Sequence, residues 1–170
     1  MDSVDFSDPL VIAGGAIVAI ILIVIAWYAL SGPSGPYVWL PTTNSAVNIT
    51  QGVIAGAASG VPLYVASTTN ASGITVFGKA NATYVWYADG GVEKKKPVGQ
   101  GWVLPSSIGK FTWSPTLTRG VTLAGAPTTY VCRAVMANGT HPGYAQGGTA
   151  YITYGGKVVS TQTFEYLNIA

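Results

Sequence analysis

The side chains with the clearest chemical potential are four asparagines. Asn48, Asn70, Asn81 and Asn138 each begin an Asn-x-Ser/Thr sequence, which is the acceptor pattern for N-linked glycosylation. The chain has six asparagines, and chance would place roughly one of them in this pattern. The excess predicts that N-linked glycans are attached and that the part of the chain carrying them is exported.

Side chains that could support catalysis are few and scattered. His141 is the only histidine and Cys132 the only cysteine, and the carboxylates after residue 31 are Asp89, Glu93 and Glu165. A zinc site, a Ser-His-Asp triad and a paired-carboxylate site each need more such groups at suitable spacing. We therefore expect no enzyme, no cofactor and no bound metal. Cys132 is expected to be a small buried apolar residue and His141 an ordinary loop residue.

Charge is also scarce, with eight Lys or Arg and six Asp or Glu in 170 residues. A nucleic-acid-binding protein needs a dense cationic surface, so nucleic acid is excluded as a partner. The run Lys94-Lys95-Lys96 is expected to be the solvated tip of a hairpin. Six aromatic residues in the second half could form a sugar- or protein-binding face, or could be core and cross-strand pairs. They are Trp102, Trp113, Tyr144, Tyr151, Tyr154 and Tyr166.

The elements that must position these residues divide at residue 31. Residues 1–9 contain three aspartates, residues 10–30 are an uncharged apolar run, and residues 31–36 are a Gly/Pro linker. The apolar run is long enough for a helix that spans a membrane or lies in the core of an assembly. A secretory signal peptide is disfavoured because no Lys or Arg precedes the run.

Small residues within this apolar run favour close packing between helices. Gly14, Gly15 and Ala19 lie on it, and Gly15 and Ala19 have the spacing of the small-xxx-small motif. The expected partners are copies of the same chain, or other subunits of an assembly, and a lipid bilayer.

Residues 37–170 are predicted to form one β-domain. Short segments of alternating apolar and polar residues, separated by Gly, Asn and Asp, are typical of a β-sandwich or a barrel. The clearest hairpin joins 149–154 to 157–160 through Gly155 and Gly156. The predicted strands are 46–54, 61–68, 73–79, 82–88, 101–104, 109–113, 120–124, 128–136, 148–154 and 157–166.

One pair of segments narrows the fold class. Trp86 lies in a predicted strand, and Tyr130 stands two residues before Cys132 in another. This arrangement resembles immunoglobulin-like sandwiches, in which a strand Trp packs near a Tyr-x-Cys strand. The strand that would carry the second cysteine has Phe77, which is expected to fill that space. We therefore expect a mainly β protein, with one N-terminal hydrophobic helix followed by an immunoglobulin-like antiparallel sandwich. Another β-sandwich or a jelly roll is the alternative.

An apolar N-terminal helix followed by a Thr- and Asn-rich β-domain resembles, in architecture, archaeal pilins and archaellins. It is also similar to a membrane-anchored virion structural protein of an archaeal virus. The resemblance implies a structural subunit of a filament or virion surface, anchored by the helix, with the glycosylated domain outside. The alternative is a single-pass cell-surface adhesin or receptor-like binding module.

Overall fold

The computed structural model describes residues 37–42, 49–123 and 126–170, all within one compact unit, Pro33–Ala170. The predicted helix at 10–30, its packing residues Gly14, Gly15 and Ala19, the linker and Asn48 lie outside the described residues. The domain boundaries drawn from the sequence remain predictions.

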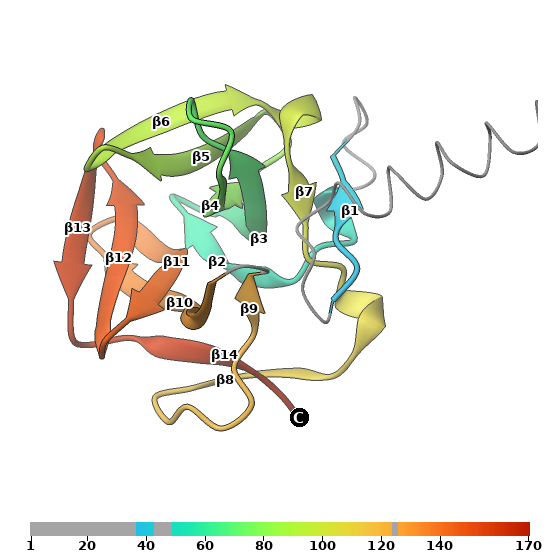
Figure 1. Cartoon of the computed structure of the whole chain (residues 1–170), viewed down its shortest axis with the longest axis vertical. Coiled ribbons are helices and arrows are strands. Elements are labelled where there is room, and N and C mark those ends of the chain that lie inside the picture. The colour runs from blue at the N-terminus through green and yellow to red at the C-terminus, as the bar shows by residue number, and fades with distance from the viewer. Residues whose placement is uncertain (1–36, 43–48, 124–125) are drawn as a thin grey trace, which may run out of the picture. The chain divides into compact units, whose positions relative to one another are not determined.

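The described chain folds into antiparallel strands with two short 3-10 turns (Figure 1). The first half contains β1 (Leu40–Pro41), β2 (Ile54–Ala58), β3 (Val61–Thr69), β4 (Thr75–Ala80), β5 (Tyr84–Asp89), β6 (Val92–Pro97), η1 (Val98–Gln100) and β7 (Trp102–Val103). The second half contains η2 (Ser106–Ile108), β8 (Phe111–Ser114), β9 (Thr122–Leu123), β10 (Ala126–Met136), β11 (Gly139–Gln146), β12 (Thr149–Tyr154), β13 (Lys157–Thr161) and β14 (Glu165–Ile169).

Eight of the strands close into a barrel. Going round, the order is β3, β4, β5, β6, β13, β12, β11 and β2, and β2 pairs again with β3. The ring is closed between the two halves of the chain by β6 with β13, at Val92 and Lys157, and by β2 with β11, at Ala58 and Gly139. The other six strands extend the sheet from β3 and from β11.

The predicted immunoglobulin-like sandwich is therefore wrong. A sandwich keeps two separate sheets, whereas here the strand edges that would bound them pair with each other and produce a closed barrel. The residues behind that prediction also lie differently. Trp86 packs edge-on against Tyr84 of its own strand, while Cys132 is buried among small side chains such as Ala134 and Ala145.

No helix in the described ranges is long and apolar enough to cross a membrane. The predicted transmembrane helix, and the membrane-anchored location derived from it, are contradicted by this finding. The apolar run that suggested them is not among the described residues.

The barrel contains an internal duplication. Residues 52–104 and 120–167 follow the same path, with matching glycines, matching core positions and matching pairings. In both copies a valine amide donates to a leucine carbonyl, Val53 to Leu104 at 2.7 Å and Val121 to Leu167 at 2.9 Å. The equivalent residues, first repeat first, are Val53 and Val121, Tyr64 and Tyr130, Val65 and Val131, Gly78 and Gly143, Ala80 and Ala145, Gly91 and Gly156, and Leu104 and Leu167.

Two glycines are required by this repeated packing. A Cβ on Gly78 would lie 2.4 Å from the carbonyl oxygen of Trp86, and one on Gly143 would lie 2.3 Å from that of Tyr151. Both distances are far below van der Waals contact, so β4 and β11 can approach their neighbouring strands only with glycine there.

The largest buried cluster draws on both repeats. It includes Trp39, Val65, Phe77, Val131 and Leu167, with the Trp39 and Phe77 rings 6.2 Å apart. Two smaller buried clusters each lie within one half of the chain, so the largest cluster is the one that joins the two repeats.

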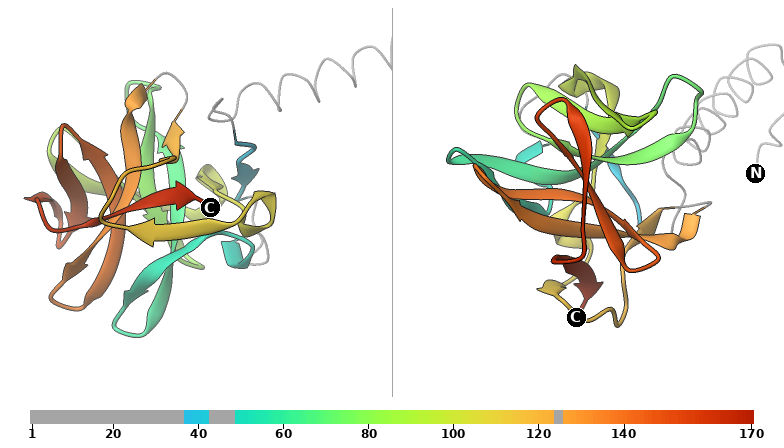
Figure 2. Two further views of the ribbon diagram at one scale, coloured as in Figure 1. Left: turned by 90° about the horizontal axis from the view of Figure 1, so that it is seen from below. Right: turned by 90° about the vertical axis from the view of Figure 1, so that its left-hand side faces the viewer.

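The C-terminal strand β14 lies between β10 and β8 (Figures 1 and 2). Both edges of β14 are occupied, so this strand has no free edge for a neighbouring chain. Among the described strands longer than two residues, β8 is the one with a single partner, because it pairs with β14 on one side and with no other described strand.

Candidate functional site

A buried polar network lies on the side of β4, β6, β11 and β12 that lines one pocket of the barrel. Lys79 of β4 is its centre, with its Nζ 2.9 Å from the Oε1 of Glu93 on β6. The ammonium also donates to the Nδ1 of His141 at 3.2 Å and to the backbone carbonyl of Thr153. The side chains of Lys79 and Glu93 are only 6% and 11% exposed, so this is a largely buried ion pair.

The proton positions on His141 follow from its partners. Lysine is a donor only, so the Nδ1 of His141 must accept, and the proton of the neutral ring is on Nε2. Nε2 therefore donates to the Oδ1 of Asn138, 2.7 Å away in the turn between β10 and β11. The Tyr154 ring packs edge-to-face on the imidazole at 5.1 Å.

Burial controls the titration of these groups. Burial and, to a smaller extent, the positive charge of Lys79 lower the pKa of His141 from 6.5 to about 4, against the opposing effect of the Glu93 carboxylate. Burial also lowers the pKa of Lys79, against the opposing effect of its hydrogen bond to Glu93. At neutral pH the imidazole is therefore uncharged.

The network forms one wall of an open pocket of about 420 Å³. Trp86 lies beside the ammonium, with Lys79 Nζ 5.9 Å from its ring centroid. The pocket lining is Ala58, Val61, Leu63, Lys79, Asn81, Trp86, Glu93, Asn138, His141, Tyr154 and Gly155. Aromatic walls with a few fixed donors and acceptors are suited to binding a small polar ligand.

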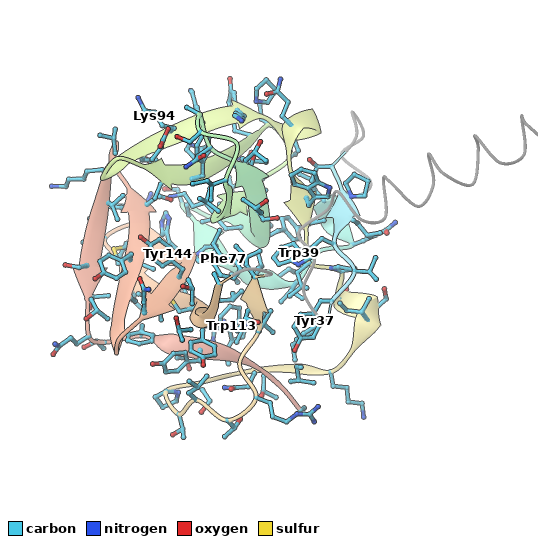
Figure 3. The ribbon with its side chains drawn as sticks, in the orientation of Figure 1. Tyr37, Trp39, Phe77, Lys94, Trp113 and Tyr144 are labelled. Carbon is cyan, nitrogen blue, oxygen red and sulfur yellow. The ribbon has the colours of Figure 1, made fainter. Side chains whose placement is uncertain are left out.

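The equivalent position in the second repeat has no charged side chain in place of Lys79. Tyr144 stands where the first repeat has Lys79, and Tyr151 stands where it has Trp86. Their rings stack at 5.1 Å with 20° between the planes, which makes them a cross-strand pair. Tyr144 instead packs against the core cluster that contains Phe77, as Figure 3 shows. Within the described residues, the polar network centred on Lys79 therefore has no counterpart around Tyr144.

Three of the four asparagines predicted to carry glycans, Asn70, Asn81 and Asn138, lie among the residues that the structure describes. In each of them the side-chain oxygen Oδ1 accepts a hydrogen bond. Asn70 accepts from two backbone amides at 2.9 and 3.0 Å, Asn81 from two at 2.8 and 2.9 Å, and Asn138 from His141. The structure brings Asn81 and Asn138 to the same pocket and leaves Asn70 outside its lining. Glycosylation itself remains a prediction.

Other predicted residues have clear positions. Cys132 is fully buried, as expected, and burial raises its pKa well above the ordinary range of a thiol. The prediction that His141 is an ordinary loop residue is wrong, because His141 lies on β11 and is 3% exposed. The prediction that Lys94, Lys95 and Lys96 form a hairpin tip is also wrong, because they lie within β6. Figure 3 shows Lys94 at the outer rim.

Lys79 was missed by the sequence reasoning. Nothing near it in sequence marks it as polar and buried, because its partners lie on β6, β11 and β12. The available signal was the repeat: aligning Gly78-Lys79-Ala80 with Gly143-Tyr144-Ala145 shows one lysine at an otherwise apolar or aromatic core position. In the described residues, no group of three or more His, Cys, Asp or Glu could hold a metal ion.

Comparison with known proteins supports the fold alone. No protein-family model matches the sequence, and no curated protein matches it. A solved structure that does match is the nematode sperm cell motility protein MFP2B, with 18% identity, a TM-score of 0.50 and coverage of 70% of this chain. The match covers 42% of that protein, so the chain spans less than half of its length.

The architectural resemblance to pilins, archaellins and virion proteins is wrong, because the described residues form a closed barrel and the structure they match is none of these proteins.

Proposed function

We propose that the chain is a non-enzymatic structural subunit of a surface assembly that associates with copies of itself through β8. The observation that carries the proposal is the open edge of this strand, Phe111–Ser114, which pairs only with β14 among the described strands. It contains no charge or proline, the devices that usually prevent edge-to-edge pairing.

The side chains around β8 support association. A groove of about 340 Å³ beside the strand is lined partly by Ile54, Phe111 and Trp113, and Ile54 is 56% exposed. The Cζ of Arg133 lies 4.5 Å above the Trp113 ring, and its Nε donates to Glu165 at 2.7 Å. The indole is thus held in place before any partner arrives, which reduces the entropy cost of association.

Sedimentation velocity of the full chain tests this proposal. Thr112 is exposed in the middle of β8, and Thr112→Lys would place two like charges near each other in a β8–β8 pair. We expect concentration-dependent oligomers from the parent chain and from Ser160→Lys, a matched control on the exposed face of β13. We expect none from Thr112→Lys. Oligomers that are equally strong in Thr112→Lys would refute association through β8.

A second candidate function is a binding module, and the Lys79 network favours it. Fixed donors and acceptors beside the Trp86 and Tyr154 rings suit a small ligand with hydroxyl groups. Calorimetric titration with a panel of neutral monosaccharides tests this function. We expect binding that is lost in Lys79→Met and kept in Thr112→Lys. Lack of binding across the panel would reject this ligand class.

A further inference from the structure

Two of the predicted glycosylation sites line one pocket. Asn81 lies in the turn between β4 and β5, and Asn138 in the turn between β10 and β11, yet both line the pocket that contains Lys79. They come from different repeats and different turns, so the sequence gives no reason for them to be neighbours. The fold therefore brings two glycan acceptors to one opening.

In both residues, the atom that would carry the sugar is available. The glycan is attached to Nδ2, whereas the side-chain hydrogen bonds of Asn81 and Asn138 use Oδ1. Asn168, which is not in a sequon, differs: it is 2% exposed and its Nδ2 donates to the Thr116 carbonyl at 3.0 Å. Among the described residues, Asn81 and Asn138 have Oδ1 fixed and Nδ2 without a protein acceptor.

We propose that Asn81 and Asn138 are glycosylated and that their first sugars cover this pocket, so that glycosylation controls access to the Lys79 network. The reaction requires a sugar linked to a polyprenyl phosphate or pyrophosphate. The bond from sugar C1 to the phosphate oxygen breaks, the bond from C1 to Nδ2 forms, Nδ2 loses a proton, and the lipid phosphate leaves.

The pocket is suited to holding the sugars that would cover it. Trp86 and Tyr154 offer ring faces and edges to the apolar side of a sugar, and the Glu93 carboxylate has acceptor capacity left for a hydroxyl. A sugar attached at the rim pays little entropy of association, because its attachment raises its effective concentration there. The inference rests on the proposed binding function, since it concerns the same pocket.

The only histidine gives a specific probe of the pocket. Diethyl pyrocarbonate modifies neutral imidazole, and His141 is the one imidazole in the chain. The full chain would be produced in a glycosylating host, site occupancy measured by glycopeptide mass spectrometry, and the rate of His141 modification followed by peptide mass.

Sequon variants keep the asparagine side chains in place. Thr83→Ala with Thr140→Ala removes both sequons at the pocket, Thr83→Ser with Thr140→Ser preserves them, and Ser72→Ala removes only the sequon of Asn70. We expect His141 to react at least several-fold faster in the double alanine variant than in glycosylated parent. The serine variant and Ser72→Ala should react as slowly as glycosylated parent.

Two results would overturn the inference: absence of glycan at both Asn81 and Asn138, or equal His141 reactivity with and without those glycans. Failure of the binding function is a separate result. If His141 is protected in glycosylated parent and reactive in the double alanine variant, but that variant binds no sugar in calorimetry, the covering glycans are supported and the external ligand is rejected.

Discussion

Acid should destabilise this barrel through its one histidine. The pKa of His141 is about 4 in the folded protein and 6.5 in an unfolded chain. As the pH falls below 6.5, the unfolded state binds a proton that the folded state rejects, so stability is lost until the pH falls below about 4. The stabilisation is fully present above pH 6.5.

The size of this loss follows from the two pKa values. Their difference corresponds to about 3 kcal/mol at roughly 1.4 kcal/mol for each tenfold change. Solvent at the open mouth of the pocket screens part of the interaction, which reduces the expected loss to about 2 kcal/mol. The groups that face the imidazole are Lys79 from β4, Glu93 from β6, Asn138 from the β10–β11 turn and Tyr154 from β12.

Urea denaturation at a series of pH values between 7 and 4 measures the effect. The matched variant is His141→Gln, which can accept from Lys79 and donate to Asn138 but does not titrate. Other carboxylates contribute equally to both proteins, so the informative quantity is the difference between them. The parent should lose about 2 kcal/mol more than the variant. Parallel stability curves for the two proteins would refute the account of the His141 environment.

Three further changes probe the same structure by urea denaturation. Glu93→Gln should cost about 3 kcal/mol, because it leaves the buried Lys79 ammonium without its carboxylate; a loss near zero would contradict the buried pair. Gly143→Ala should cost at least about 2 kcal/mol, since its Cβ would overlap the Tyr151 carbonyl; the outcome that contradicts this is a neutral substitution. Asn168→Ala should cost about 2 kcal/mol by removing hydrogen bonds to backbone atoms of residues 116–119; unchanged stability would show that this loop needs no such support.

Local features of the barrel could be predicted from the sequence. The hairpin with Gly155 and Gly156 is confirmed as β12 and β13, and both glycines have positive φ, of 61° and 84°. The predicted strand 128–136 corresponds to β10. These succeed because alternation and turn chemistry are properties of neighbouring residues.

The strand β11 was missed for an equally physical reason. Pro142 and Gly143 are typical of a loop, but here Gly143 is needed for the close approach to β12. The choice between a sandwich and a barrel also depends on distant residues. It is decided by the pairing of Val92 with Lys157 and of Ala58 with Gly139, which no local pattern encodes.

The candidate site was less predictable than the fold. Glu93 and His141 were considered only as possible catalytic groups, and Lys79 was not singled out at all. A buried ion pair between strands has no signature in either strand, because each partner looks like an ordinary surface residue in its own segment. Only the comparison of the two repeats could have marked Lys79 as unusual.

The most direct test of self-association is amide hydrogen exchange of the full chain at low and high concentration. We predict that Phe111–Ser114 becomes protected as concentration rises, while the β12 and β13 hairpin stays unchanged, and that Thr112→Lys abolishes this protection. Exchange in β8 that is independent of concentration, in a sample that nevertheless forms oligomers, would contradict the claim that this strand is the interface.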